Sequence, residues 1–125
     1  MTNYTKEWDI MKLAIVGSRT FTDYNKMKKE ILKAVNIEDV ELIVSGGAQG
    51  TDALAERFAE EYNIPTNIIY PNWIIGRQAG IMRNARIVDE SDRVIAFWDG
   101  KSRGTKFTIN YCKRCNKDIV VCRSD

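Results

Sequence analysis

Five short apolar runs alternate with longer helix-like segments, and this alternation constrains the fold of the chain more than any other feature. The runs lie at residues 12–17, 41–45, 66–70, 93–97 and 118–122, and the helix-like segments at 24–35, 51–62, 80–89 and 105–116. Most runs are apolar throughout, which is typical of parallel strands with helices on both faces, because neither face meets water. The pattern predicts an α/β protein, a Rossmann-like three-layer sandwich with a mainly parallel five-stranded sheet.

The length of 125 residues fits a single domain, for which we expect the core to span about residues 12–122. The chain has 3 cysteines and no His, so its Cys112-X-X-Cys115 motif lacks the remaining ligands of a zinc site. We expect no metal ion and no cofactor. No apolar stretch approaches the ~20 residues of a membrane span, and the opening segment lacks the apolar core of a signal peptide, so we expect a cytoplasmic protein with no membrane partner.

The charge is nearly balanced, with 19 Lys and Arg against 17 Asp and Glu, a net charge of +2. Residues 1–60 hold 8 basic and 10 acidic side chains (net −2), whereas residues 61–125 hold 11 and 7 (net +4). The total is far below that of a dedicated nucleic-acid binder, which argues against DNA as a partner. The basic second half suits a small anionic ligand instead.

Glycine-containing loops follow three of the predicted strands, with the sequences GSRTF, SGGAQGTD and WDGKSRGT. In open α/β sheets the ligand lies beyond the carboxyl ends of the strands. Glycines let the backbone approach a ligand, and the free amides at a helix start attract an anion. We expect a phosphate there; the alternative is turns that only join strands to helices. The candidate ligand-binding residues are Gly17, Ser18, Arg19, Ser45, Gly46, Gly47, Gln49, Gly50, Thr51, Asp52, Arg83, Asn84, Trp98, Asp99, Ser102, Gly104 and Thr105.

Two polar residues, Arg83 and Asn84, lie early in the third predicted helix, on which we expect Ile81, Ala85 and Val88 to be buried. An Arg can hold a phosphate through two parallel hydrogen bonds, and an Asn can pair with a sugar or a base. The alternative for this pair is a surface salt bridge. Trp73 and Trp98 fall near the same edge, where they either stack on a base or belong to the core.

Taken together, GSRTF (17–21), SGGAQGTD (45–52), AGIMRN (79–84) and AFWDGKSRGT (96–105) resemble the YspA-like branch of the SLOG superfamily. That superfamily includes the Lonely Guy cytokinin-activating enzymes and the DNA-processing protein DprA. The resemblance spans residue 12 to about residue 121. It implies a Rossmann-like fold that binds nucleotides or nucleotide-derived molecules, often as a dimer, and roles as a sensor or sequestering protein for signals of the ADP-ribose type.

The resemblance also bears on catalysis. It places Arg83 where the Lonely Guy enzymes have an Arg, and residues 104–105 on their Gly-Thr pair. Thr108 stands where those enzymes have the Glu that their hydrolytic reaction uses. Turnover is therefore left open, and the catalytic candidates are Arg83, Asp52 and Asp99.

Three functions follow from these features. The sequence favours binding of a phosphorylated nucleotide or nucleotide-derived ligand by a homo-oligomer. The first alternative is a nucleotide N-glycosidase or phosphoribohydrolase. The second alternative, single-stranded DNA binding as in DprA, ranks last because the net charge is only +2.

Overall fold

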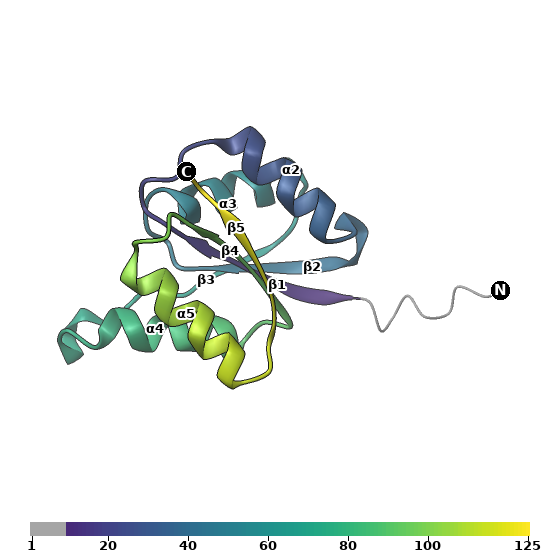
Figure 1. Ribbon diagram of the computed structural model, residues 1–125. Helices are drawn as coiled ribbons and strands as arrows, with labels where there is room; N and C mark the ends of the chain where they lie inside the picture. Colours follow the sequence, from purple (N-terminus) through teal and green to yellow (C-terminus); the bar gives the residue numbers. More distant parts are fainter. Residues whose placement is uncertain (1–9) are drawn as a thin grey trace.

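A computed structural model of the chain describes residues 10–125 as a five-stranded sheet with helices on both faces (Figure 1). All neighbouring strands are parallel, in the order β3-β2-β1-β4-β5. The strands are β1 (Met11–Gly17), β2 (Val40–Ser45), β3 (Thr66–Ile68), β4 (Arg93–Trp98) and β5 (Asp118–Arg123). The predicted α/β class and the Rossmann-like three-layer arrangement are confirmed.

Four α-helices form the two outer layers, and two short 3-10 turns join them to the strands. The helices are α2 (Tyr24–Ala34), α3 (Thr51–Glu61), α4 (Ala79–Asp89) and α5 (Arg103–Arg114), and the turns are η1 (Ile37–Asp39) and η2 (Trp73–Ile75). Helices α2 and α3 cover one face of the sheet, and α4 and α5 cover the other (Figure 1). Each face has its own core, which includes Phe58 and Phe97 on the first and Ile87 and Val94 on the second.

The elements begin where local sequence signals favour them. Asp23 precedes α2, and its carboxylate accepts a hydrogen bond of 3.0 Å from the amide of Lys26, which satisfies one of the free donors of the first turn. The strands and helices lie within two residues of the predicted bounds. The edge strand β3 ends at Ile68 rather than at Tyr70 because its pairing with β2 stops there.

The direction in which the chain winds reverses between β1 and β4. From β1 the chain builds β2 and β3 on one side, then crosses to β4 and β5 on the other. In this register Gly17, the last residue of β1, pairs with Phe97 of β4. The loops that leave these two strands diverge to opposite faces of the sheet, which opens a crevice at their carboxyl ends.

One core prediction is wrong: Ile81 of α4 is 42% exposed. Ile87 and Val88, farther along the same helix, are buried. Figure 1 shows that the start of α4 and the turn before it extend past the ends of the strands, so that no sheet lies beneath them. The large apolar side chains of residues 70–82 are consequently exposed, with Ile74 at 94%. Within residues 10–125 no helix is both long enough and apolar enough to cross a membrane.

Gly50 provides a test of the turn that leads into α3. Its φ is +73°, and a Cβ built there would lie 2.2 Å from the carbonyl oxygen of Arg19. We expect Gly50→Ala to lower the free energy of unfolding by roughly 1–3 kcal/mol, because alanine is strained in this conformation and the neighbouring turn must also move. Urea denaturation measures the change.

Gly80→Ala is the matched control, because the nearest atom to its Cβ would be 3.9 Å away and the residue lies within α4. It should stabilise the protein by up to about 1 kcal/mol. Equal effects of the two substitutions on stability would contradict the strained conformation inferred for residue 50.

Candidate phosphate-binding pocket

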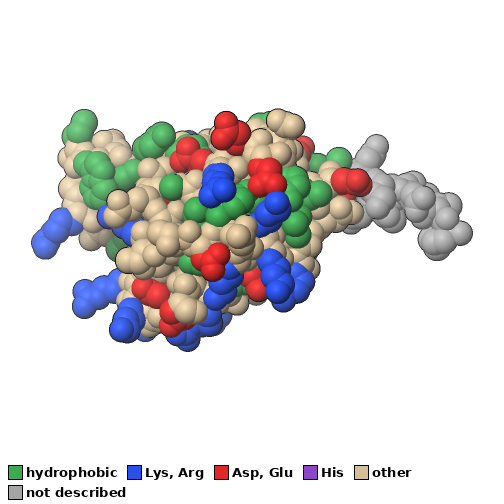
Figure 2. Space-filling model, turned by 90° about the horizontal axis from the view of Figure 1, so that it is seen from above, with side chains coloured by type: hydrophobic (Ala, Val, Ile, Leu, Met, Phe, Trp, Pro, Cys, Tyr) green, Lys and Arg blue, Asp and Glu red, His purple; other side chains and the backbone are tan. Residues whose placement is uncertain are grey.

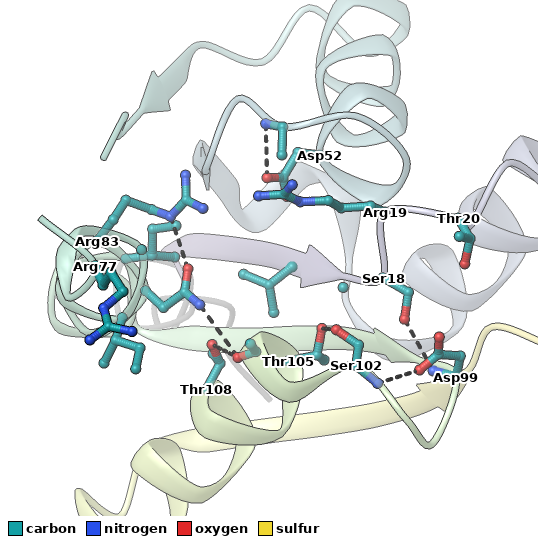
Figure 3. A pocket seen from close by; sticks show the side chains of 18 of the residues that line it. Ser18, Arg19, Thr20, Asp52, Arg77, Arg83, Asp99, Ser102, Thr105 and Thr108 are labelled. Carbon is teal, nitrogen blue, oxygen red and sulfur yellow. Dashed lines mark hydrogen bonds between the residues drawn. The ribbon is translucent and has the colours of Figure 1, made fainter. Parts of the chain in front are cut away.

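The crevice between β1 and β4 is a pocket of about 460 Å³ (Figure 3). Its walls come from the loop after β1, the start of α3, the helix α4 with the turn before it, and the loop from β4 into α5. The polar side chains that line it are Ser18, Arg19, Thr20, Asp52, Arg77, Arg83, Asn84, Asp99, Ser102, Thr105 and Thr108. The pocket thus combines hydroxyl, carboxylate and guanidinium groups from four separate parts of the chain.

Ser18 joins three of these loops. Its amide donates to the carbonyl oxygen of Phe97 at 2.9 Å, and its side-chain hydroxyl accepts from the amide of Asp99 at 3.1 Å. Its carbonyl oxygen accepts from both the amide and the hydroxyl of Thr51, at 3.2 Å and 2.8 Å. Ser18 is only 1% exposed, so water does not compete for these bonds.

Asp99 closes the loop that leads into α5. One of its carboxylate oxygens accepts from the amides of Lys101 and Ser102, both at 2.8 Å. These two amides, Ser102 foremost, lower the pKa of Asp99, because they stabilise its charged form. Trp98 supports the same loop, since its indole nitrogen donates to the carbonyl oxygen of Ser102 at 3.0 Å.

Asp52 lies at the base of the pocket, in the first turn of α3. Its carboxylate accepts from the amide of Ala48 at 3.1 Å and lies 3.1 Å from the hydroxyl of Ser45, which is also 3.1 Å from the carbonyl oxygen of Ile15. One hydroxyl proton cannot serve both acceptors fully. Burial raises the pKa of Asp52, which favours a proton on this carboxyl.

Arg83 is held in place by bonds within the protein. Its Nη1 donates to the carbonyl oxygen of Gly46 at 2.6 Å, and its Nε donates to the side-chain oxygen of Asn84 at 2.9 Å. Burial lowers its pKa, and the carboxylate of Asp52 opposes that shift. Gly46 lies between the two charges, because a Cβ built on it would meet Arg83 Nη1 at 2.7 Å and Asp52 Oδ2 at 2.8 Å.

Two other arginines of the pocket are exposed, Arg19 after β1 and Arg77 before α4. Within residues 10–125 neither makes an ion pair or a side-chain hydrogen bond with the protein. Their guanidinium groups are therefore available to an anion. Figure 3 shows Arg19 and Arg77 on opposite sides of the pocket, with Arg83 on the same side as Arg77.

A second hollow of about 360 Å³ adjoins the first and shares Arg19, Ala48, Trp73 and Arg83 with it. Its other walls are Gly46, Gly47, Gln49, Tyr70 and Pro71. Trp73 and Tyr70, taken as whole residues, are 62% and 67% exposed. Flat aromatic surfaces therefore border the arginine cluster on its outer side.

The structure brings most of the candidate ligand-binding residues to these two hollows. Those lining the first are Gly17, Ser18, Arg19, Asp52, Arg83, Asn84, Asp99, Ser102, Gly104 and Thr105, and Gly46, Gly47 and Gln49 line the second. Ser45, Gly50, Thr51 and Trp98 line neither and instead support the loops. Sequence reasoning missed Thr20, Arg77 and Thr108.

Several amides that the glycine loops were expected to offer a phosphate already have protein partners. The amides of Ala48, Thr51 and Ser102 donate to Asp52, Ser18 and Asp99, respectively. Asp52 and Asp99, the carboxylates among the catalytic candidates, thus hold these loops in place. Arg19 and Arg77 are among the groups that, within residues 10–125, remain free to meet an anion. Within residues 10–125 no group of three His, Cys, Asp or Glu side chains is placed to hold a metal ion.

The sheet and its crevice define a Rossmann-like α/β protein with a basic pocket at the switch point of the sheet. The sequence model of the family described as DNA recombination-mediator protein A matches residues 4–74, more than half of the chain. The chain belongs to this family. The Rossmann-like fold is also consistent with the SLOG superfamily.

Three relatives extend the comparison. The Gene 61 protein of Mycobacterium phage D29 is 26% identical over 117 residues, which cover 87% of this chain and 94% of that protein. The X-ray structure of DNA processing protein A (DprA) from Streptococcus pneumoniae matches with a TM-score of 0.72 at 20% identity over 95% of this chain. DNA processing protein A from Helicobacter pylori, studied for its single-stranded DNA binding mode, matches 95% of this chain with a TM-score of 0.66 at 22% identity.

This chain spans 52% of the Streptococcus pneumoniae chain and 68% of the Helicobacter pylori chain. The two structures share its fold.

The family match corrects two expectations drawn from the sequence. The expected function, sensing or sequestering a small nucleotide-derived ligand, is wrong, and so is the argument against DNA as a partner. The error has a physical origin: a net charge of +2 averages over the whole surface, whereas binding depends on the charge at one site. Here three arginines share one pocket with two carboxylates.

The opposite pKa shifts of Asp52 and Asp99 predict opposite pH dependences. The raised pKa of Asp52 lets the folded protein hold a proton that the unfolded chain releases above its ordinary pKa of 3.8, so this group's contribution to stability falls as the pH rises. Relative to Asp52→Asn, wild type should lose stability as the pH rises above about 4 and through the raised pKa of the folded state.

For Asp99 the folded pKa is lowered, so its contribution is present at neutral pH and is lost as the pH falls through that value. Relative to Asp99→Asn, wild type should therefore gain stability as the pH rises. Urea denaturation at several pH values measures both differences. The same trend for both variants would refute the opposite pKa shifts of Asp52 and Asp99.

Proposed function

We propose that this chain binds single-stranded DNA, with the phosphate backbone in the pocket between β1 and β4. The observation that carries the proposal is that Arg19, Arg77 and Arg83, from three separate segments, line this one pocket. Family membership and the single-stranded DNA binding of the Helicobacter pylori relative support it. Charge-assisted bonds from Arg to phosphate are among the strongest hydrogen bonds in proteins.

The arginines divide into two roles. Arg83 is oriented by Gly46 and Asn84, so it offers a fixed positive charge at the base. Arg19 and Arg77 make no ion pair or side-chain hydrogen bond within residues 10–125 and are placed to neutralise phosphates in the pocket, with the guanidinium of Arg19 beside Asp52 (Figure 3). Such contacts give affinity without reading the base sequence.

The aromatic side chains favour a single strand over a duplex. Trp73 and Tyr70 border the arginines and are largely exposed. Base-aromatic stacking requires an unpaired base, and it tolerates any sequence because every base has a flat face. Phosphates in the first hollow and bases against the second form the arrangement that we propose.

We further propose that the chain belongs to the YspA-like branch of the SLOG superfamily, on the strength of its GSRTF and AFWDGKSRGT motifs. Two expectations from the sequence stay predictions: that the chain forms a single domain, and that it associates with copies of itself. Analytical ultracentrifugation of the purified protein tests the self-association.

The double variant Arg19→Gln/Arg77→Gln tests the DNA proposal. We expect its affinity for an oligothymidylate to fall by roughly tenfold or more, because each arginine makes a charge-assisted bond to a phosphate. The slope of log K against log salt should become shallower by about 1.4, since each single-strand phosphate contact contributes about 0.7. Fluorescence anisotropy at several salt concentrations measures both quantities.

The matched control is Lys29→Gln/Lys33→Gln. It removes the same amount of positive charge from α2, which covers the face of the sheet opposite to α4 and α5. It should bind as wild type does. A duplex of the same length should bind more weakly than the single strand. Absence of oligothymidylate binding by wild type, or equal binding by the two double variants, would overturn the proposal.

A further inference from the structure

A basic surface outside the pocket begins at its mouth. Between Asp99 and Asp118 the chain carries six Lys or Arg and no Asp or Glu, and this stretch contains the whole of α5. The first turn of α5 forms part of the pocket wall through Gly104 and Thr105. The same helix therefore connects the pocket to the outer surface of the molecule.

The basic side chains of α5 lie along one side of the helix. At 100° per residue, Arg103, Lys106, Lys113 and Arg114 fall within an arc of about 100°. Of the side chains buried against the sheet, Thr108 and Cys112 lie on the opposite side of the helix, and Ile109 lies between them and the basic arc. All four basic residues are exposed.

Two of the six cations are engaged within the protein. The Nζ of Lys117 donates to the carbonyl oxygen of Ser91, and the guanidinium of Arg114 lies 5.9 Å from the centre of the Tyr111 ring. Within residues 10–125 the other four make no ion pair. We call these four residues the α5 ridge: Lys101 in the loop just before α5, and Arg103, Lys106 and Lys113 on the helix.

The helix itself explains only part of this charge. Lys113 lies in the last turn of α5, where the helix dipole favours a cation. Arg103 and Lys106 lie at the other end, where the dipole disfavours cations and where the first turn carries no acidic residue. Local stability therefore gives no reason for cations at this end, and an anion bound there would compensate both of them.

The layer on the far side of the sheet is different. Helix α2 also carries four lysines, but Glu61 pairs with Lys28 at 2.6 Å and Glu30 pairs with Lys33 at 3.7 Å. Figure 2 looks down on this layer and shows acidic and basic side chains interspersed. Acidic side chains thus pair with two of the four lysines of α2, whereas within residues 10–125 none of the four cations of the α5 ridge has such a partner.

We propose that the α5 ridge is a second contact surface for nucleic acid, along which a strand held in the pocket continues outward. This inference rests on the proposed function. The 12 residues of α5 span about 18 Å, the axial length of about five nucleotides of one strand at the 3.4 Å rise of B-DNA. A positively charged track beside the pocket is the device by which single-strand binders follow a backbone. The ridge lengthens the binding site without adding sequence preference.

The test compares Lys106→Gln/Lys113→Gln with the control Lys29→Gln/Lys33→Gln. Both change two helical lysines to glutamine and lower the net charge equally, and neither pair lines the pocket. Each is assayed with oligothymidylates of about 4 and about 16 nucleotides, the two ends of the usual range of site sizes. Circular dichroism checks that both variants keep their helices.

The ridge variant should bind the long oligonucleotide more weakly than the control does, with a salt slope shallower by about 1.4, and it should bind the short one as wild type does. Arg19→Gln/Arg77→Gln should weaken both lengths. If wild type binds the long oligonucleotide and the ridge variant matches the control, the ridge is not a DNA contact and the pocket proposal stands. If wild type binds neither length, both proposals fail.

Discussion

The pocket depends on one buried residue, because Ser18 uses its amide, carbonyl and hydroxyl groups to join the ends of β1 and β4 to the start of α3. Two strands that diverge at a switch point leave a crevice whose loops have no sheet to hold them. Ser18 supplies main-chain and hydroxyl bonds in their place, and Asp99 and Asp52 secure the loops on either side. The positions of Arg19, Asp52 and Asp99, which adjoin these bonds, follow from this arrangement.

The parts of the fold encoded locally could be predicted from the sequence. The apolar runs indicated all five parallel strands, and the start of α2 follows a capping residue, Asp23, that is visible in the sequence. The prediction that Ile81 is buried was wrong because helical periodicity identifies the apolar side of a helix but does not show whether another element packs against that side. The start of α4 extends past the sheet, so a side chain that is apolar by pattern is exposed by position.

The sequence indicated the loops that line the candidate site and two of its three arginines, but not the third, Arg77. The rule for strand ends led to Arg19, and the place of Arg83 early in a helix, together with the resemblance to the Lonely Guy enzymes, led to Arg83. Arg77 carries no such signal, since only the path of the chain before α4 brings it to the pocket. The expectation about DNA failed for a related reason. Composition reports how many charges a chain has, and folding decides which of them share a surface.

The division of labour in this pocket bears on how such proteins diverge. Loop geometry rests on Ser18 and on main-chain atoms, whereas Arg19 and Arg77 hold no other part of residues 10–125 in place. Replacing either arginine would break none of the bonds described for these loops, so the charge that the pocket offers a ligand can change while the scaffold around it stays the same.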